Sequence, residues 1–177
     1  GEGFLVQLPA ALAASLGKRL SLFILRSKVR LAPVGDGLVR LGLTRAQAGE
    51  LLRKAGLVVP EADFEVVRRA ASADAMQPDW LLRLPGERYE LVVDGTDRAI
   101  ALWGSLCAAG AAPAGEAAWR WRAIRSGIAD IVPETQDQFV PQMLNYDLLG
   151  AVSFTKGCYP GQEIVARTQY RGEIKRR

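Results

Sequence analysis

Hydrophobic and polar positions follow helical spacing in some stretches and strand spacing in others, which predicts a chain of mixed α and β elements. The pattern predicts helices after Pro9, over residues 44–55, after Asp97, and over residues 116–125 and 163–170. It predicts short strands over residues 4–8, 29–32, 38–43, 64–69, 80–84, 89–93 and 151–154. Strands and helices that alternate in this way, with hairpins between them, predict an α+β fold of ferredoxin-like character.

Glycine and proline mark the ends of these elements. Hairpin turns are expected at Gly35-Asp36-Gly37 and at Pro85-Gly86-Glu87-Arg88, and Gly56 is expected to end the helix that Thr44 begins. The small residues 111–115 form a linker, which predicts one part over residues 1–110 and a second over residues 111–177. Residues 128–147 show no helical or strand period. An irregular segment of that length in a compact domain is usually functional or disordered.

The composition is that of an ordinary globular protein. The chain has 177 residues, of which 49% are hydrophobic and 24% charged, with a formal net charge of +4. The basic residues occur in short clusters, which are typical of solvated faces, so we expect no direct contact with nucleic acid. No apolar run approaches the roughly 20 residues that span a bilayer, and no signal peptide opens the chain. We therefore expect a cytoplasmic protein without membrane contact.

The absence of histidine restricts the chemistry that this chain performs by itself. Without histidine there is no Ser-His or Cys-His relay and no histidine-bound metal. Cys107 and Cys158 form no C-x-x-C pair, so no metal site is predicted and a reducing compartment fits best. Cys107 lies in a helical stretch and is expected to be a buried small hydrophobe.

The segment Lys156-Gly157-Cys158-Tyr159-Pro160-Gly161-Gln162-Glu163 is the most informative part of the sequence. It follows a predicted strand and precedes a predicted helix, which would place Cys158 at a helix N-terminus and favour its thiolate. Gln162 and Glu163 are expected to reach back to backbone N–H groups of the turn. A structural turn whose cysteine merely packs is the alternative, and the turn residues alone do not decide between the two.

The stretch from Phe154 to Arg167 closely resembles the signature K-G-C-Y-x-G-Q-E-x-V-A-R of the YgfZ family. Upstream, Gly127-Ile128, the stretch from Gln138 to Gln142, and Asn145 are similar to that family's segment before the signature. Lys175-Arg176 fits the Lys-Arg that follows it. Weaker similarity extends back to Leu8-Pro9-Ala10, so the resemblance covers essentially the whole chain.

This resemblance implies a folate-binding fold like that of the aminomethyltransferase of the glycine cleavage system. It implies an accessory protein that binds tetrahydrofolate and supports iron–sulfur client proteins, including enzymes that modify tRNA. It also leads us to expect an N-terminal segment before Gly1 and a C-terminal β-barrel after Arg177. Cys158 is then the functional thiol, and the implied ligand-binding residues are Trp119, Lys156, Gly157, Tyr159, Gly161, Gln162, Glu163 and Arg167.

The sequence departs from the family pattern beside the predicted folate site. Many folate-binding relatives have Glu-Ala-Gly before the irregular segment, whereas this chain has Arg125-Ser126-Gly127. A carboxylate there would accept hydrogen bonds from the pterin, and an arginine only donates. Trp119 is expected either to stack on the pterin or to anchor the core, and Trp121, two residues on, should point to another side of the helix.

Two other functions stay open. An aminomethyltransferase of the glycine cleavage type would pass a one-carbon unit to tetrahydrofolate, although such enzymes lack K-G-C-Y at this junction. Whether any reaction is catalysed is therefore not decided by the sequence. A thiol-dependent nucleophilic enzyme lacks a histidine base in this segment, so the base would have to come from sequence outside it.

Overall fold

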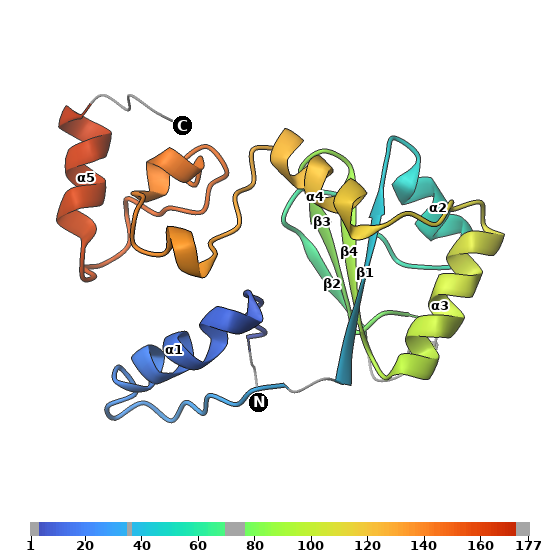
Figure 1. Cartoon of the computed structure of the whole chain (residues 1–177), viewed down its shortest axis with the longest axis horizontal. Coiled ribbons are helices and arrows are strands. Elements are labelled where there is room, and N and C mark those ends of the chain that lie inside the picture. The colour runs from blue at the N-terminus through green and yellow to red at the C-terminus, as the bar shows by residue number, and fades with distance from the viewer. Residues whose placement is uncertain (1–3, 35–36, 70–76, 173–177) are drawn as a thin grey trace. The chain divides into compact units, whose positions relative to one another are not determined.

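The computed structural model describes residues 4–34, 37–69 and 77–172, which belong to two compact units (Figure 1). Unit 1 comprises residues 1–32 and 127–177, and unit 2 comprises residues 33–126. The boundary that the linker predicts, between residues 110 and 111, lies inside unit 2. The assignment of residues 1–110 and 111–177 to parts of a folate-binding domain stays a prediction.

Unit 2 is built on one antiparallel sheet. Its strands are β1 (Leu38–Thr44), β2 (Val66–Arg68), β3 (Trp80–Leu84) and β4 (Arg88–Asp94), in the order β1-β4-β3-β2. Leu91 of β4 lies opposite Leu41 of β1 and Leu81 of β3, which fixes the register of β1, β4 and β3. The predicted hairpin turn between residues 84 and 88 is confirmed, whereas Gly35 and Asp36 of the other predicted turn lie outside the described residues.

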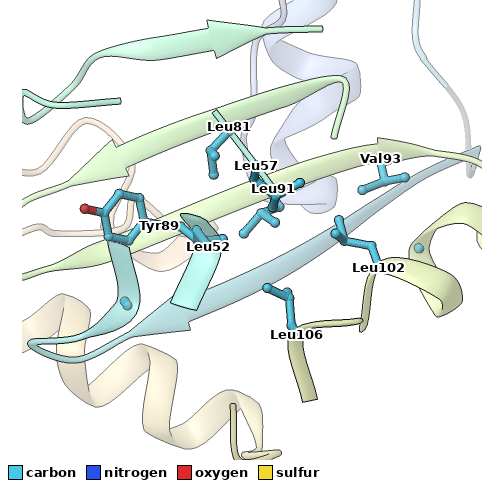
Figure 2. Packing of buried hydrophobic residues seen from close by; sticks show 10 residues of the cluster. Leu52, Leu57, Leu81, Tyr89, Leu91, Val93, Leu102 and Leu106 are labelled. Carbon is cyan, nitrogen blue, oxygen red and sulfur yellow. The ribbon is translucent and has the colours of Figure 1, made fainter. Parts of the chain in front are cut away.

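Helices α2 (Ala48–Lys54) and α3 (Thr96–Ala108) cover one face of this sheet. Figure 2 shows Leu52 of α2 and Leu102 and Leu106 of α3 packed with Leu91 and Val93 of β4. Alternate residues of a strand point to the same face, so β4 presents every second side chain to this core. All five of these side chains are at most 5% exposed, which makes this face the hydrophobic core of the unit.

The opposite face of the sheet is covered in part by α4 (Glu116–Arg125), which contacts β1. This face carries charged residues of β4 that are nonetheless buried, since Arg88 is 3% exposed and Glu90 is 7% exposed. Glu90 Oε1 lies 3.9 Å from Arg40 Nη1 of β1. Strand β4, which is paired on both sides, is thus also buried on both faces of the sheet.

Unit 1 contains α1 (Ala10–Ser21), the 3₁₀ turns η2 (Pro133–Thr135) and η3 (Pro141–Leu144), and α5 (Gln162–Arg171). The predicted lack of regular structure over residues 128–147 is confirmed apart from the two 3₁₀ turns. No residue of α1 is buried in the described part of the chain. Val165 and Gln142 are the buried residues of this unit in the described part of the chain.

Three predicted strands are not strands in the structure, namely residues 4–8, 29–32 and 151–154. A strand is stabilised by backbone hydrogen bonds to a neighbour, and these short apolar runs have no paired strand among the described residues. The helix expected from Thr44 begins instead at Ala48, because Thr44 ends β1 and pairs with Arg88. Helix α3 buries Ala99, Leu102 and Leu106, whereas Ile100 and Trp103 are exposed.

The α+β class is confirmed, but unit 2 does not follow the ferredoxin-like order of elements. That order is β-α-β-β-α-β, whereas the described elements of unit 2 begin β-α-β-β-β-α. The aminomethyltransferase-like fold stays a prediction. None of the helices in the described residues is long and apolar enough to cross a membrane.

Candidate functional site

The segment around Cys158 is an irregular turn that leads into α5. Residues 157–159 have no regular structure, and α5 begins at Gln162 after Gly161, which caps it with a φ of +85°. A helical residue has a φ near −60°, so the helix cannot extend back through Gly161. The prediction that Cys158 lies at a helix N-terminus is therefore wrong, because α5 begins four residues later.

The two cysteines have different environments. Cys158 is exposed, whereas Cys107 in α3 is half-buried. The sulfur of Cys158 is therefore accessible to a reagent or partner and is not packed in a core. Its role as a functional thiol stays a prediction.

Gln162 holds the turn in place. Its backbone N–H donates to the carbonyl oxygen of Tyr159 at 3.2 Å. Its side-chain Oε1 accepts a hydrogen bond from the backbone N–H of Tyr159, also at 3.2 Å. The prediction that Gln162 reaches back to a backbone donor is thus confirmed, and the two bonds fix Tyr159 against the first turn of α5.

A surface pocket of about 180 Å³ lies beside this turn. Four of the predicted site residues line it, namely Lys156, Tyr159, Gln162 and Glu163. The other lining residues are Ser153, Phe154, Ala166 and Tyr170. Of these, Tyr170 could have been found from the sequence, because it lies four positions after Ala166 and therefore on the same helix face.

The aromatic side chains of the pocket are arranged at defined angles. The Phe154 and Tyr170 rings meet edge to face, with centroids 6.4 Å apart and planes at 68°. The Lys156 ammonium lies 4.4 Å from the centroid of the Tyr159 ring, within the range of a cation–π contact. The pocket therefore combines ring surfaces, a cation and the Glu163 carboxylate.

The remaining predicted motif residues do not line the pocket. Gly157 and Gly161 are exposed positions of the turn, and the Arg167 side chain is exposed on α5. Lys175 and Arg176 lie outside the described residues.

Two polar residues of the irregular segment support the motif. The side chain of Gln142, which is fully buried, donates from Nε2 to the carbonyl oxygen of Val165 in α5 at 2.8 Å. Asn145, at a φ of +61°, donates from Nδ2 to the carbonyl oxygen of Gly127 at 3.1 Å. Residues 127, 142 and 145 carry the upstream part of the family resemblance, and the structure gives them this bracing role.

Tyr146 follows these bracing residues. Burial raises the pKa of its phenol, and the nearby Asp130 carboxylate raises it further. The phenol consequently stays protonated at neutral pH.

Trp119 lies in α4 of unit 2 and is not among the residues that surround the pocket. Its indole packs on Gly42 of β1, where an added Cβ would come within 2.6 Å of the ring. The Arg88 guanidinium lies 4.3 Å from its centroid. These contacts fit the core-anchor interpretation of Trp119, and its role in folate binding stays a prediction.

Arg125 and Ser126, which stand where many folate-binding relatives have Glu-Ala, both make contacts within unit 2. The Arg125 guanidinium lies 5.3 Å from the centroid of Trp121, a side chain that is 54% exposed. Ser126 Oγ is within hydrogen-bond distance of the carbonyl oxygens of Pro85, at 3.1 Å, and Arg122, at 2.9 Å. Ser126 thus ties the end of α4 to the turn between β3 and β4, whereas Arg125 contacts a side chain of α4 itself.

Within the described ranges, no group of three or more Cys, Asp or Glu side chains is placed to hold a metal ion. Fold and site together define an α+β protein that carries an accessible thiol beside a surface pocket. No protein-family model matches the chain.

Curated relatives do match it, and each of the following is named tRNA-modifying protein YgfZ. The chain is 40% identical to the Edwardsiella ictaluri protein over 141 residues, which are 80% of this chain and 41% of that protein. It is 39% identical to the Klebsiella pneumoniae protein over 85% of this chain and 43% of that protein. It is 36% identical to the Yersinia pseudotuberculosis protein over 99% of this chain and 51% of that protein.

These matches extend over most of the chain and agree with the motif. The chain therefore belongs to the YgfZ family. It spans about half the length of the curated relatives that it matches.

Proposed function

We propose that this chain is part of a tetrahydrofolate-binding accessory protein that supports the assembly or repair of iron–sulfur enzymes, including enzymes that modify tRNA. Cys158 is its functional thiol. The tRNA part of the proposal is supported by the names of the relatives. The iron–sulfur and folate parts follow from the family resemblance of the motif.

The observation that carries the proposal is the exposure of Cys158 in a segment whose neighbours line a pocket. A soft thiolate suits contact with iron or an iron–sulfur cluster. One cysteine does not make a stable cluster site, and no group of three or more Cys, Asp or Glu side chains among the described residues is placed to hold a metal ion. Transient contact with a cluster, an iron ion or a client protein therefore fits this site better than storage.

Trp119 is the residue proposed to contact the pterin. An indole that stacks on a flat ring contributes about 0.5 to 1.5 kcal/mol beyond the area it buries. Stacking would have to take place beside the contacts that Trp119 already makes with Gly42 and Arg88.

Titration of the intact protein with tetrahydrofolate, followed by tryptophan fluorescence, tests the folate part. We expect saturable binding that Trp119→Phe weakens by roughly 2- to 10-fold. The matched variant Trp121→Phe should bind as the wild type does, because that exposed ring stacks with Arg125. Cys158→Ala should keep tetrahydrofolate binding. Absence of saturable binding would remove folate from the proposed function.

A further inference from the structure

Helix α4 has an inner and an outer face, and the packing of unit 2 accounts only for the inner one. On the inner face, the Trp119 indole packs on Gly42 of β1. Arg122 donates from Nε to Thr44 Oγ1 at 3.1 Å, and Ala123 is buried. These contacts hold α4 in unit 2 without any contribution from its outer face. The residues of the outer face therefore have no structural task that explains them.

The outer face carries Arg120, Trp121, Ile124 and Arg125, which we call the α4 patch. Spacings of three and four residues make neighbours on a helix surface, and each of these side chains has such a neighbour in the patch. Trp121 is 54% exposed and Ile124 is 74% exposed, whereas a solvated helix face normally carries polar side chains. Arg120 and Arg125 are exposed as well. The α4 patch thus combines apolar surface with two cations.

The charge of the α4 patch favours an anionic partner. A guanidinium is charged at every physiological pH, and the patch has two of them. Among the described residues, no carboxylate forms an ion pair with Arg120 or Arg125. Glu116, the carboxylate of α4, lies in the first turn of the helix, before the patch. The two arginines are thus available to the phosphates of a nucleic-acid strand, which carries one negative charge per nucleotide.

The Trp121 indole gives the α4 patch a flat surface. The Arg125 guanidinium lies 5.3 Å from the centroid of this ring, and more than half of the residue stays exposed. Sites for single-stranded nucleic acid combine a cationic surface, which follows the backbone, with aromatic rings on which unpaired bases stack. An acidic protein would match the cations, whereas a nucleotide matches both the cations and the flat ring.

We propose that the α4 patch binds single-stranded RNA, with an unpaired base stacked on Trp121 and the neighbouring phosphates held by Arg120 and Arg125. The inference goes beyond the proposed function and rests on it only for the choice of RNA over DNA. It differs from the expectation of no direct contact with nucleic acid, which follows from the basic clusters of the sequence alone. Such clusters are typical of solvated faces, but the structure places an exposed indole next to two of the arginines.

Fluorescence anisotropy of a short labelled RNA strand, titrated with the intact protein, tests this proposal. We expect saturable binding of the single strand and weaker binding of a duplex of the same sequence, whose bases are not free to stack. Trp121→Ala should weaken binding by about 5- to 150-fold, the loss expected for one stacked base. Trp121→Phe keeps a ring and should lose less. The matched control is Trp103→Ala in α3, at an indole that is 41% exposed, which should bind as the wild type does.

The salt dependence of binding tests the arginines of the α4 patch. Each phosphate contact that is lost should reduce the slope of log K against log salt concentration by about 0.7 for a single strand. Arg125→Ala should show this reduction. Arg53→Ala, at an exposed arginine of α2, should not. Because both variants remove one positive charge, a difference between them reports the position of the charge and not the net charge of the protein.

A DNA strand of the same sequence and polyglutamate complete the experiment. RNA binding at least as tight as DNA binding assigns the α4 patch to RNA. Tighter binding of DNA, RNA binding unaffected by Trp121→Ala, or no RNA binding would overturn the proposal. Binding of polyglutamate that depends on Trp121 as strongly as RNA binding does would assign the patch to an acidic protein and would also overturn it. Cys158→Ala should bind RNA as the wild type does, so the proposed function, which depends on Cys158, is tested separately.

Discussion

The contact between Gly42 and Trp119 shows how a single missing side chain shapes unit 2. An added Cβ at Gly42 would come within 2.6 Å of the indole, closer than real Cβ atoms approach other atoms. The ring lies against the backbone of β1, and Arg88 lies over the same ring. Residue 42 thus has to be glycine for Trp119 to take this place.

Gly42→Ala should therefore destabilise the protein by about 1 to 3 kcal/mol, the usual cost of forcing an extra group into a packed site. Urea unfolding of the variant measures this change. The matched control is Gly104→Ala in α3, where an added Cβ meets nothing within 4 Å. That variant should be stabilised by about 0.5 to 1 kcal/mol, because alanine favours the helix. Equal stability of Gly42→Ala and the wild type would contradict the packing described for Trp119.

Asp79 is the carboxylate of unit 2 with the most hydrogen bonds. It accepts from the backbone N–H of Asp94 at 2.7 Å, from Arg98 Nη1 at 2.8 Å and from Arg69 Nε at 3.1 Å. Burial by itself raises the pKa of Asp79, but these hydrogen bonds outweigh it and hold the pKa below its ordinary value. The ionised form is consequently stabilised by folding.

A lowered pKa in the folded state gives a defined pH dependence. The stability that Asp79 contributes is fully present above its unfolded pKa, near 3.9, and is lost as the pH falls through its lower folded pKa. Asp79→Asn should lower the free energy of unfolding at pH 7 by on the order of 1 kcal/mol. The difference from wild type should shrink below about pH 4. If the difference in the free energy of unfolding stayed constant from pH 7 to pH 2, the charge of Asp79 would not be the source of its stabilising effect.

Among the helices and strands, sequence spacing correctly predicts the elements whose ends are marked by turn residues. Helix α4 has its predicted bounds because Gly115 precedes it and Ser126-Gly127 follows it. Strand β3 also has its predicted bounds, since the turn from Pro85 separates it from β4. Neither case depends on residues distant in sequence.

Elements that depend on a distant partner are predicted poorly. Residues 151–154 have the composition of a strand, but no neighbouring strand pairs with them in the described chain. The inward face of α3, with Leu102 and Leu106, is set by contact with β1 and β4, which spacing within the helix alone does not reveal. The family resemblance predicted the pocket residues that lie within the motif. The hydrogen bond from Gln142, in the irregular segment, to α5 could not be predicted in this way, because it depends on tertiary contact.

Gln142 offers a test of how η3 and α5 support the motif. Gln142→Leu keeps a similar volume but removes the donor to the Val165 carbonyl, a change expected to cost about 1 to 3 kcal/mol at a buried site. Amides of α5 should then exchange with solvent faster in a hydrogen–deuterium experiment. Gln138→Leu is the matched control, because Gln138 is exposed and donates only to the local carbonyl of Glu134. Unchanged exchange in α5 of the Gln142 variant would contradict the bracing role.

At the scale of the whole molecule, the two units differ in how well they are packed. Nearly all buried apolar side chains of the described residues belong to unit 2, whereas unit 1 contributes Val165. The motif and its pocket belong to unit 1. The site that defines the family is thus carried by the unit with the smaller core, in a chain that spans about half the length of its curated relatives.

In the proposed function, the exposed thiol of Cys158 performs the protein's cellular task. The most direct measurement is the level of an iron–sulfur-dependent tRNA modification, determined by mass spectrometry in cells whose only copy of the protein carries Cys158→Ala. Cys107→Ala is the matched control, since that thiol is half-buried in α3. We expect a fall toward the level of the deletion strain for Cys158→Ala and a wild-type level for Cys107→Ala. A wild-type level in the Cys158→Ala cells would contradict it.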